Sequence, residues 1–321
     1  MPLIPESTYR PPSWLRGGHW QTVHPVLFRR VEKVTTRRER LELDDGDFLD
    51  LDWSGNSADK LAVISHGLEG SSQATYVQGM AKAFIKRGWD VLAWNMRGCS
   101  GELNRLPSFY HSGKTEDLDL VIRHAQKVHP ANSIDLIGFS LGGNLTLKYV
   151  GERGKDIDPM IRRAVAFSVP CELSCCSRTL EEKANRLYME RFLKTLRRKV
   201  VEKERVFPGE LDVGRVEGIR TFAGFDGRFT APLHGFRDAE DYWNRSSCRR
   251  VLADIAIPSL LVNAANDPIL GADCYPEEEA RSSSKFHFEI PKNGGHCGFG
   301  AGGEYWSESR AVQFLGSAQL G

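Results

Sequence analysis

The sequence predicts an α/β fold with a mainly parallel central sheet, helices on both faces of the sheet and an inserted helical cap. Short apolar runs typical of buried strands alternate with amphipathic helical segments up to residue 170, and again from residue 259 onward. Strands separated by helices usually pair in parallel, because the helix carries the chain back across the sheet. Residues 172–250 break the alternation, so they are predicted to be a cap inserted into a single domain of residues 1–321.

The composition excludes several classes of protein. The chain has 321 residues, 40% of them hydrophobic and 26% charged, with a formal net charge of +1. These values describe an ordinary globular protein with no excess charge for binding nucleic acid. The first twenty residues lack the apolar core of a signal peptide, and no window approaches the roughly 18 apolar residues of a membrane span. We expect a cytoplasmic protein with no integral membrane segment and no nucleic-acid partner, and the oligomeric state is left open.

The N-terminal half is predicted to begin with an irregular arm and a hairpin. Residues 1–30 are rich in proline and glycine and are expected to form the arm. The turn signal "DDGD" separates the two strands of a hairpin within residues 31–53. The next predicted strands cover 61–67, 90–96 and 134–139, and the helices that follow them cover 74–88, 115–129 and 141–154.

The C-terminal half adds the cap and the remaining strands. The predicted strands cover 163–170, 259–267 and 285–290, and a last helix covers about 304–317. In the cap, residues 176–206 predict an amphipathic helix with a break, and residues 207–245 predict loops and short turns. This helix carries ten Lys and Arg against five Glu between Arg178 and Arg205. We interpret it as a solvated face over an apolar stripe; peripheral contact with an anionic membrane is the less favoured alternative.

Ser140 lies between two glycines at the end of a predicted buried strand. The stretch "SIDLIGFSLGGNLTLKYV", residues 133–150, changes from strand to helix within one residue, which requires a very tight turn. Larger side chains would collide in that turn, so Gly138 and Gly142 are needed on both sides of the serine. The serine itself is expected to adopt a strained backbone conformation with its oxygen exposed. This pattern is typical of the nucleophile elbow of α/β-hydrolases.

An elbow serine needs a base, and the base needs an acid that orients it. In open α/β sheets, sites form at the carboxyl ends of strands. Asp267 ends one predicted strand, and His296 lies in the loop after the next. The order Ser140, Asp267, His296 is the one that α/β-hydrolases use, so His296 is predicted to take the serine proton and Asp267 to hold the histidine tautomer. Asp254 precedes the same strand and Asp273 lies beyond its end, so both are less favoured than Asp267.

Backbone amides are expected to complete this site as an oxyanion hole. The loop "SHGLEG" follows the strand at 61–67, whose tip should lie beside the elbow. We expect the backbone N–H groups of Leu68 and Leu141 to point at the developing negative charge. One such donor lowers the barrier by roughly 3–4 kcal/mol.

The cap is expected to cover the acyl pocket, since no other segment is long enough to do so. Its apolar residues either pack the cap onto the domain or line the pocket. The candidates are Leu187, Phe192, Phe225, Phe229 and Tyr242.

Neither a metal nor a cofactor is expected. The seven cysteines are an odd number and are interpreted as reduced thiols. The spacing of Cys171, Cys175 and Cys176 fits no zinc-binding pattern. The stretch "HSGKTED" is similar to the end of a phosphate-binding loop, but that loop needs glycine at position 108, which is Ser108.

Eight short motifs are spread over most of the chain. They are "GGHWQT" (17–22), "LELDDGDFLDLDW" (41–53), "HGLEGSS" (66–72), "NMRGCSGELNR" (95–105), "YHSGKTED" (110–117), "GFSLGGN" (138–144), "HGFRDAEDYW" (234–243) and "GGHCGF" (294–299). Together they resemble the YheT-like branch of the α/β-hydrolase superfamily. The resemblance implies a triad of Ser140, Asp267 and His296, in agreement with the positional prediction. Asn266 departs from the family pattern, which often has two consecutive acids here.

The resemblance also implies an activity. It points to a serine carboxylesterase that acts on short- to medium-chain acyl esters, with a small-molecule or lipid-like substrate. Two alternatives stay open: an acyltransferase that uses the same acyl-enzyme with an alcohol in place of water, and a non-enzymatic binding protein with the hydrolase fold. His19, His111 and Asp117, which lie in two of the motifs, are expected to tie the arm and a loop to the sheet by hydrogen bonds.

Overall fold

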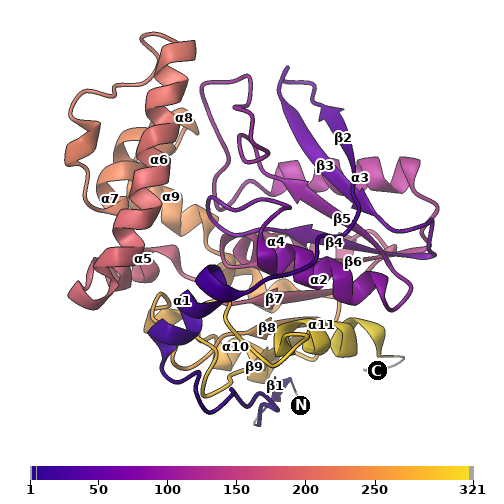
Figure 1. Cartoon of the computed structure of the whole chain (residues 1–321). Helices are drawn as coiled ribbons and strands as arrows, with labels where there is room; N and C mark the ends of the chain where they lie inside the picture. Colours follow the sequence, from indigo (N-terminus) through magenta and orange to yellow (C-terminus); the bar gives the residue numbers. More distant parts are fainter. Residues whose placement is uncertain (1, 5, 318–321) are drawn as a thin grey trace.

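A computed structural model describes residues 2–4 and 6–317, within which nine strands form one sheet (Figure 1). The strand order is β1-β9-β8-β7-β6-β4-β5-β3-β2. Strand β3 runs antiparallel to its neighbours β2 and β5, and the other pairs in this part of the chain are parallel. The strands are β1 (Leu3–Ile4), β2 (Arg37–Glu42), β3 (Phe48–Ser54), β4 (Lys60–Ser65), β5 (Asp90–Asn95), β6 (Ser133–Phe139), β7 (Ile161–Phe167), β8 (Ser259–Val262) and β9 (Phe286–Glu289). This mainly parallel sheet confirms the predicted fold class.

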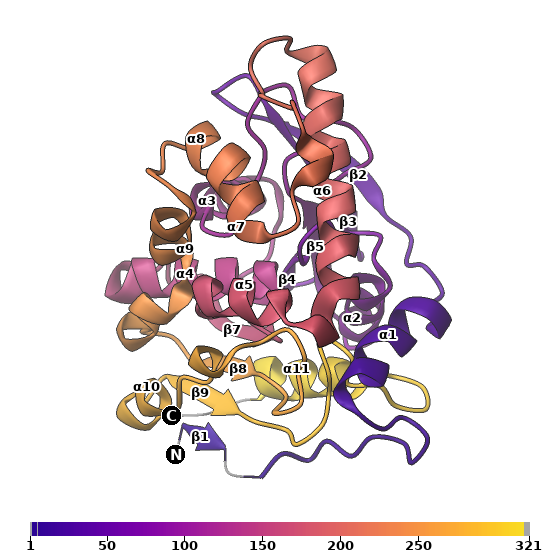
Figure 2. The same cartoon turned by 90° about the vertical axis from the view of Figure 1, so that its left-hand side faces the viewer.

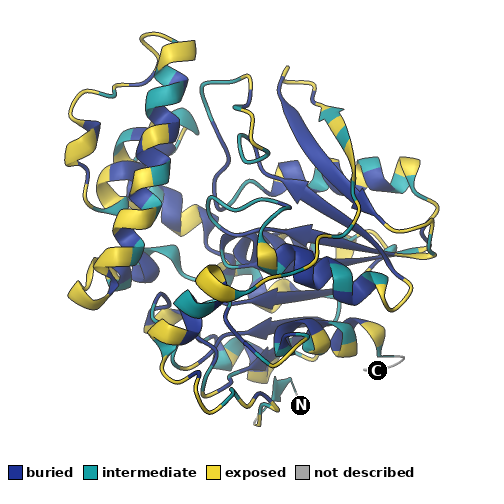
Figure 3. Ribbon diagram, viewed as in Figure 1, coloured by how far each residue is buried: buried dark blue, intermediate teal, exposed yellow. Residues whose placement is uncertain are grey.

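Helices cover both faces of the sheet (Figures 1 and 2). Helices α2 and α11 pack together on one face, and α3 and α4 pack on the other. In β4, Leu61 and Val63 join the core on the α3–α4 side, whereas Ala62 and Ile64 join the core on the α2–α11 side. The inner strands β4 to β8 are therefore largely buried on both faces, which explains their mostly apolar sequences, whereas the edge strand β2 is largely exposed (Figure 3). The helices that pack on the sheet are α2 (Thr75–Ile85), α3 (Thr115–Val128), α4 (Leu141–Arg153), α10 (Glu277–Ser282), which contacts β9, and α11 (Trp306–Gly316).

The expectation of an irregular arm over residues 1–30 is wrong. Leu3–Ile4 forms a strand beside β9, and α1 spans Gly18–Phe28 with Pro25 in its interior. A loop was predicted because proline usually interrupts a helix. The buried Gln21 and Thr22 hold α1 in place through tertiary contacts, and local propensity does not report such contacts.

The segment between β7 and β8 forms the cap helices on the left of Figure 1. The predicted break separates α5 (Leu173–Glu181) from α6 (Arg186–Val206). The expectation of loops and short turns is wrong for α9 (Ala239–Ser246), where the Asp238 side chain caps the helix by accepting the backbone N–H of Asp241. The cap also contains the short helices α7 (Phe222–Phe225) and α8 (Ala231–Leu233). Among the described residues, no helix is both long and apolar enough to cross a membrane.

Candidate active site

Ser140 occupies the turn between β6 and α4. Its φ of 51° and ψ of −120° lie in a region that few residues other than glycine adopt. A Cβ atom on Gly138 would lie 2.5 Å from the carbonyl oxygen of Gly142, and one on Gly142 would lie 2.3 Å from that of His66. These close approaches confirm that both positions require glycine. The strained turn holds the serine at its apex, at the edge of a cavity.

His296 and Asp267 form a chain of hydrogen bonds with Ser140. The Ser140 Oγ lies 2.9 Å from Nε2 of His296, and Nδ1 of His296 lies 2.9 Å from Oδ2 of Asp267. The serine hydroxyl donates to Nε2, and the Nδ1–H donates to the carboxylate, which fixes the histidine tautomer. Asp267 is buried and also accepts the backbone N–H of Ile269 at 2.9 Å. The structure therefore brings the three predicted side chains together in an order suited to removing the serine proton.

The N-terminal helix α1 anchors the loop that carries His296. The Oγ1 atom of Thr22 accepts the backbone N–H of His296 at 2.9 Å, and Oε1 of Gln21 accepts that of Gly294 at 2.8 Å. Both residues lie in the motif "GGHWQT", which drew attention to His19 instead. The sequence analysis missed them because nothing in a polar helical pair indicates which distant loop it binds.

Asn266 lies beside Asp267 and links the loop of this acid both to α1 and to the loop of His296. Its Nδ2 donates to Oε1 of Gln21 at 2.8 Å, and its Oδ1 accepts the backbone N–H of Gly295 at 3.1 Å. An aspartate could supply only the acceptor. Asn266 departs from the family pattern, and Gln21 is the residue whose oxygen accepts the N–H that its amide provides.

A buried histidine shapes the loop after β4. The Nδ1–H of His66 donates to the carbonyl oxygen of Gly67 at 2.8 Å, and its Nε2 accepts the backbone N–H of Met96 at 3.1 Å. Burial lowers the pKa of His66 to about 4, so the imidazole stays neutral and can accept this bond. The N–H groups of Leu68 and Leu141, the expected oxyanion donors, have no hydrogen-bond acceptor in residues 2–4 and 6–317. Both residues line the cavity at the elbow, so these donors are available to a ligand oxygen.

Glu69 joins the loop of Leu68 to the cap. Its backbone is left-handed, with φ 52°, and its carboxylate pairs with Lys199 of α6. The Tyr110 hydroxyl donates to the same carboxylate at 2.8 Å and accepts the backbone N–H of Glu69 at 2.8 Å. Lys199 is buried, so each partner of the ion pair would be left uncompensated without the other. The position of the Leu68 N–H thus depends on a residue of the cap.

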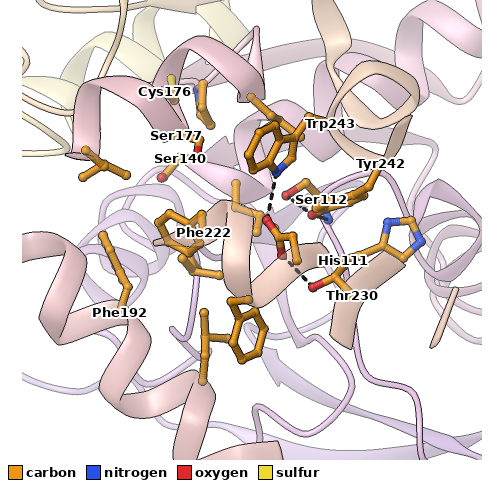
Figure 4. Close-up of a pocket in the computed structure, with 18 of the residues that line it drawn as sticks. His111, Ser112, Ser140, Cys176, Ser177, Phe192, Phe222, Thr230, Tyr242 and Trp243 are labelled. Carbon is orange, nitrogen blue, oxygen red and sulfur yellow. Dashed lines mark hydrogen bonds between the residues drawn. The ribbon is translucent and has the colours of Figure 1, made fainter. Parts of the chain in front are cut away.

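The cavity lies between the cap and the tips of the strands (Figure 4). Three of the five predicted lining residues contribute to its wall: Phe192, Phe225 and Tyr242. The other two do not. Leu187 lies 83% exposed on the outside of α6, and Phe229 is buried in the core of the cap, against Phe225. Apolar character alone does not indicate which face of a helix turns toward a cavity, and this is why these two predictions are wrong.

Polar side chains lie among the apolar ones in this wall (Figure 4). The Asp226 carboxylate accepts the Thr230 hydroxyl at 2.6 Å and the indole N–H of Trp243 at 2.8 Å. Burial raises the pKa of Asp226 to about 6. Nearby, the Tyr242 hydroxyl donates to Oγ of Ser112 at 2.9 Å. The cavity wall therefore combines apolar side chains with a small number of hydrogen-bonded polar groups.

The three polar residues expected to tie the arm and a loop to the sheet have other partners. His19 is hydrogen-bonded through Nδ1 to the Tyr188 hydroxyl at 3.1 Å, so it links the arm to the cap. His111 lines the cavity, where burial lowers its pKa. Asp117 forms two bonds with Arg97, of 2.9 and 2.8 Å, and ties α3 to the loop after β5. The expectation is therefore wrong for both histidines, and Asp117 binds a neighbouring loop.

Three buried thiols gather behind the cavity. The sulfur atoms of Cys175, Cys176 and Cys274 lie within 4.8 Å of one another, and those of Cys176 and Cys274 are 3.2 Å apart. Sequence spacing did not reveal this group, because Cys274 lies after β8 and is separated from the other two cysteines by the rest of the cap. A structural zinc site uses four ligands, so we retain the interpretation as thiols, and the absence of a metal stays a prediction.

The fold and the site define an α/β-hydrolase: a mainly parallel sheet, a serine elbow after β6, an aspartate after β8 and a histidine after β9. Two solved structures share the fold. The esterase Pf2001 of Pyrococcus furiosus is 17% identical with a TM-score of 0.60, covering 88% of this chain and 91% of that one. Est1E of Butyrivibrio proteoclasticus is 15% identical with a TM-score of 0.55, covering 86% of this chain and 97% of that one.

Sequence relatives identify the branch. The Escherichia coli (strain K12) protein named "Putative esterase YheT" is 36% identical over 92% of this chain and 89% of its own length. Phospholipase ABHD3 of Bos taurus is 30% identical over 93% of this chain and 74% of its own length. Residues 56–207 also match the family described as "Serine aminopeptidase, S33". The chain belongs to the YheT-like family of α/β-hydrolases.

Proposed function

We propose that this chain is a serine carboxylesterase that hydrolyses short- to medium-chain acyl esters through an acyl-enzyme on Ser140. The observation that carries the proposal is the pair of 2.9 Å contacts that link Ser140 to His296 and His296 to Asp267, at the edge of a largely apolar cavity. The names of the relatives, an esterase and a phospholipase, support a reaction at an ester bond.

In the first half-reaction, Ser140 Oγ attacks the carbonyl carbon of the ester while Nε2 of His296 takes the hydroxyl proton. Asp267 stabilises the imidazolium that forms. The N–H groups of Leu68 and Leu141 donate to the carbonyl oxygen as it becomes negative. The bond to the alcohol oxygen then breaks, and His296 gives its proton to that oxygen. The products are a free alcohol and an acyl group on the serine.

In the second half-reaction, water takes the place of the alcohol. His296 removes a proton from the water as its oxygen attacks the acyl carbonyl, and then returns a proton to Ser140 Oγ when the acid leaves. No cofactor takes part in either step. An alcohol that entered instead of water would yield a new ester, and this is the acyltransferase alternative.

The cavity supports the limit on chain length. Its wall is largely apolar and includes the ionisable Asp226 and the hydroxyl of Thr230. Each CH₂ group buried against apolar side chains contributes about 0.8 kcal/mol, whereas a chain that reached the polar groups would displace hydrogen bonds. A cytoplasmic location is also part of the proposal, supported by seven cysteines that form no disulfide.

The test is kcat/KM for a series of p-nitrophenyl esters, from acetate to palmitate, with Ser140→Ala as the control. We expect a maximum at short to medium chains and a loss of about 10⁴-fold or more in the variant. A variant that kept more than about a tenth of the activity would exclude Ser140 as the nucleophile. Added alcohol distinguishes hydrolysis from transfer by the ester it forms. If a fluorophosphonate probe failed to label Ser140 and no ester were cleaved, the chain would be a binding protein.

A further inference from the structure

Helix α1 turns apolar side chains to solvent and polar ones inward. Gln21 and Thr22 are buried in it, whereas Leu27 and Phe28 are 62% and 58% exposed. Within the described residues, nine large apolar side chains are exposed, and five of them lie in α1 or just before it. These five, called the α1 patch below, are Trp14, Trp20, Val26, Leu27 and Phe28. An exposed apolar patch of this kind marks a surface that meets a partner or a membrane.

The aromatic rings of the α1 patch are in contact around His24. The ring centroids of Trp14, Trp20 and Phe28 lie 4.8, 5.3 and 5.2 Å from that of His24. These rings therefore form one cluster on the surface and are not scattered over it. Tryptophan has an apolar ring and a single N–H donor, and it is enriched where lipid headgroups meet acyl chains.

The surroundings of the α1 patch are positively charged. Residues 7–31 contain four arginines and neither aspartate nor glutamate; one of the four, Arg29, is paired with the buried Glu308. Arg16 and Arg30 are exposed near the two ends of the patch, and Arg191 of α6 is exposed on the groove that runs beside it. Basic groups around an apolar helix face favour a surface of anionic lipids.

A groove leads from the α1 patch to the elbow serine. Its walls come from α1, α2 and α6, with Val26 and Arg191 among its lining residues and Ser140 and His296 at its inner end. Figures 1 and 2 both show α1 close to the lower end of α6. Ser140 thus faces two spaces, the cavity under the cap and this groove, which suit the acyl and alcohol parts of an ester respectively.

We propose that the α1 patch docks the protein on an anionic lipid surface, and that the groove beside it receives ester lipids from that surface. Tryptophans, leucine and phenylalanine enter the boundary between headgroups and chains, and the arginines contact the lipid phosphates. The delivery of substrate rests on the proposed function, whereas the docking does not.

The test is co-sedimentation with vesicles of phosphatidylcholine, with and without phosphatidylglycerol. We expect the wild-type protein to bind the anionic vesicles more tightly, with an affinity that falls at high salt. The double variant Leu27→Ser/Phe28→Ser should bind them at least about tenfold more weakly. The matched control is Leu120→Ser/Val128→Ser on α3, which removes two exposed apolar side chains elsewhere and should leave binding unchanged.

Two results would overturn the docking. One is equal vesicle binding by the wild type and the Leu27→Ser/Phe28→Ser variant, and the other is no binding by the wild type to either vesicle. If equilibrium sedimentation then showed a wild-type dimer and a monomeric variant, the α1 patch would be an interface between two copies of this chain. Hydrolysis of the soluble ester p-nitrophenyl acetate distinguishes a failure of the docking proposal from a failure of the proposed function. It should be equal in the wild type and the variant, and its absence from a protein that binds vesicles would refute only the esterase.

Discussion

The backbone N–H of His296 donates a hydrogen bond to Oγ1 of Thr22 across 2.9 Å, although the two residues are 274 positions apart in the chain. Thr22 lies on the buried side of α1, and the exposed side of the same helix carries the α1 patch. The proposed catalytic base and the proposed lipid-binding surface are therefore joined by one helix. A displacement of α1 on a lipid surface would therefore also move the loop of His296.

Removing this hydrogen bond should impair turnover. Thr22→Val keeps the shape of the side chain but leaves the N–H of His296 without its acceptor, which costs roughly 1–3 kcal/mol in a buried site. We expect kcat to fall roughly tenfold with little change in KM, because the ester does not touch Thr22. Thr22→Ser restores the acceptor and should restore kcat. Wild-type kcat in Thr22→Val together with a loss in Thr22→Ser would show that the methyl group matters and the hydrogen bond does not.

The proposed acid can be tested against its neighbours. Asp267→Asn should lower kcat by roughly 10³–10⁴-fold, because the amide favours the wrong histidine tautomer. Asp254 is exposed, and Asp273 lies 3.8 Å from Arg249 in a partly exposed ion pair. Asn at either of these positions should leave the steady-state kinetics close to wild type. A large loss in one of them, with Asp267→Asn active, would move the acid to that position.

The ion pair of Lys199 and Glu69 should control the oxyanion donor next to it. Lys199→Met leaves the partly buried carboxylate of Glu69 with the Tyr110 hydroxyl as its remaining partner, so the loop of Leu68 should shift and kcat should fall by about tenfold or more. Lys199→Arg should recover much of the loss. Arg198→Met is the matched control, since Arg198 is exposed on the same helix and pairs with Glu202 at 3.6 Å. Equal kcat in the Met variants of positions 198 and 199 would contradict the link.

The cavity wall should set the acyl length. Phe222 lines the cavity and is half-buried, so Phe222→Ala enlarges the space at modest cost to the core (Figure 4). We expect the maximum of kcat/KM to move toward longer chains, since each further CH₂ that fits contributes about 0.8 kcal/mol. Leu187→Ala, on the outside of α6, should leave the profile unchanged. The measurement is the p-nitrophenyl ester series, and an identical profile for Phe222→Ala would place the acyl chain elsewhere.

Stability should depend on the ionisation of Asp226. Burial raises its pKa to about 6 from an ordinary value of 3.8. Between these two values, the folded protein keeps a proton that the unfolded chain has lost. The free energy of unfolding therefore falls as the pH rises through this window, and above pH 6 the folded state holds a buried charge.

Asp226→Asn should remove this pH dependence. We expect the variant to match the wild type near pH 4 and to exceed its free energy of unfolding at pH 7 by up to about 3 kcal/mol. Urea unfolding at both pH values measures the difference. Asp44→Asn, at an exposed position, is the control and should change stability little at either pH. If Asp226→Asn made the protein less stable than wild type at pH 7, that result would contradict the buried charge.

Much of the fold and of the candidate site could be worked out from the residues alone, because it depends on neighbours in the chain. The alternation of apolar strands and amphipathic helices predicted the parallel sheet, and the structure confirms it. The need for Gly138 and Gly142 follows from the tight turn at Ser140. Asp267 and His296 could be chosen because parallel strands place their carboxyl ends at one edge of the sheet.

Only the tertiary structure decided the rest, since it depends on contacts between segments that are distant in sequence. Five prolines and two glycines suggested an irregular arm, yet the loop of His296 gives Gln21 and Thr22 their partners and holds α1 as a helix. The same helix exposes Leu27 and Phe28, a face that composition does not reveal. The inward side of α6 is set by its packing on the domain and on the other cap helices, which turns Leu187 outward. Local residue preferences amount to a few tenths of a kcal/mol per position, and burial of side chains between distant segments, worth more, overrides them.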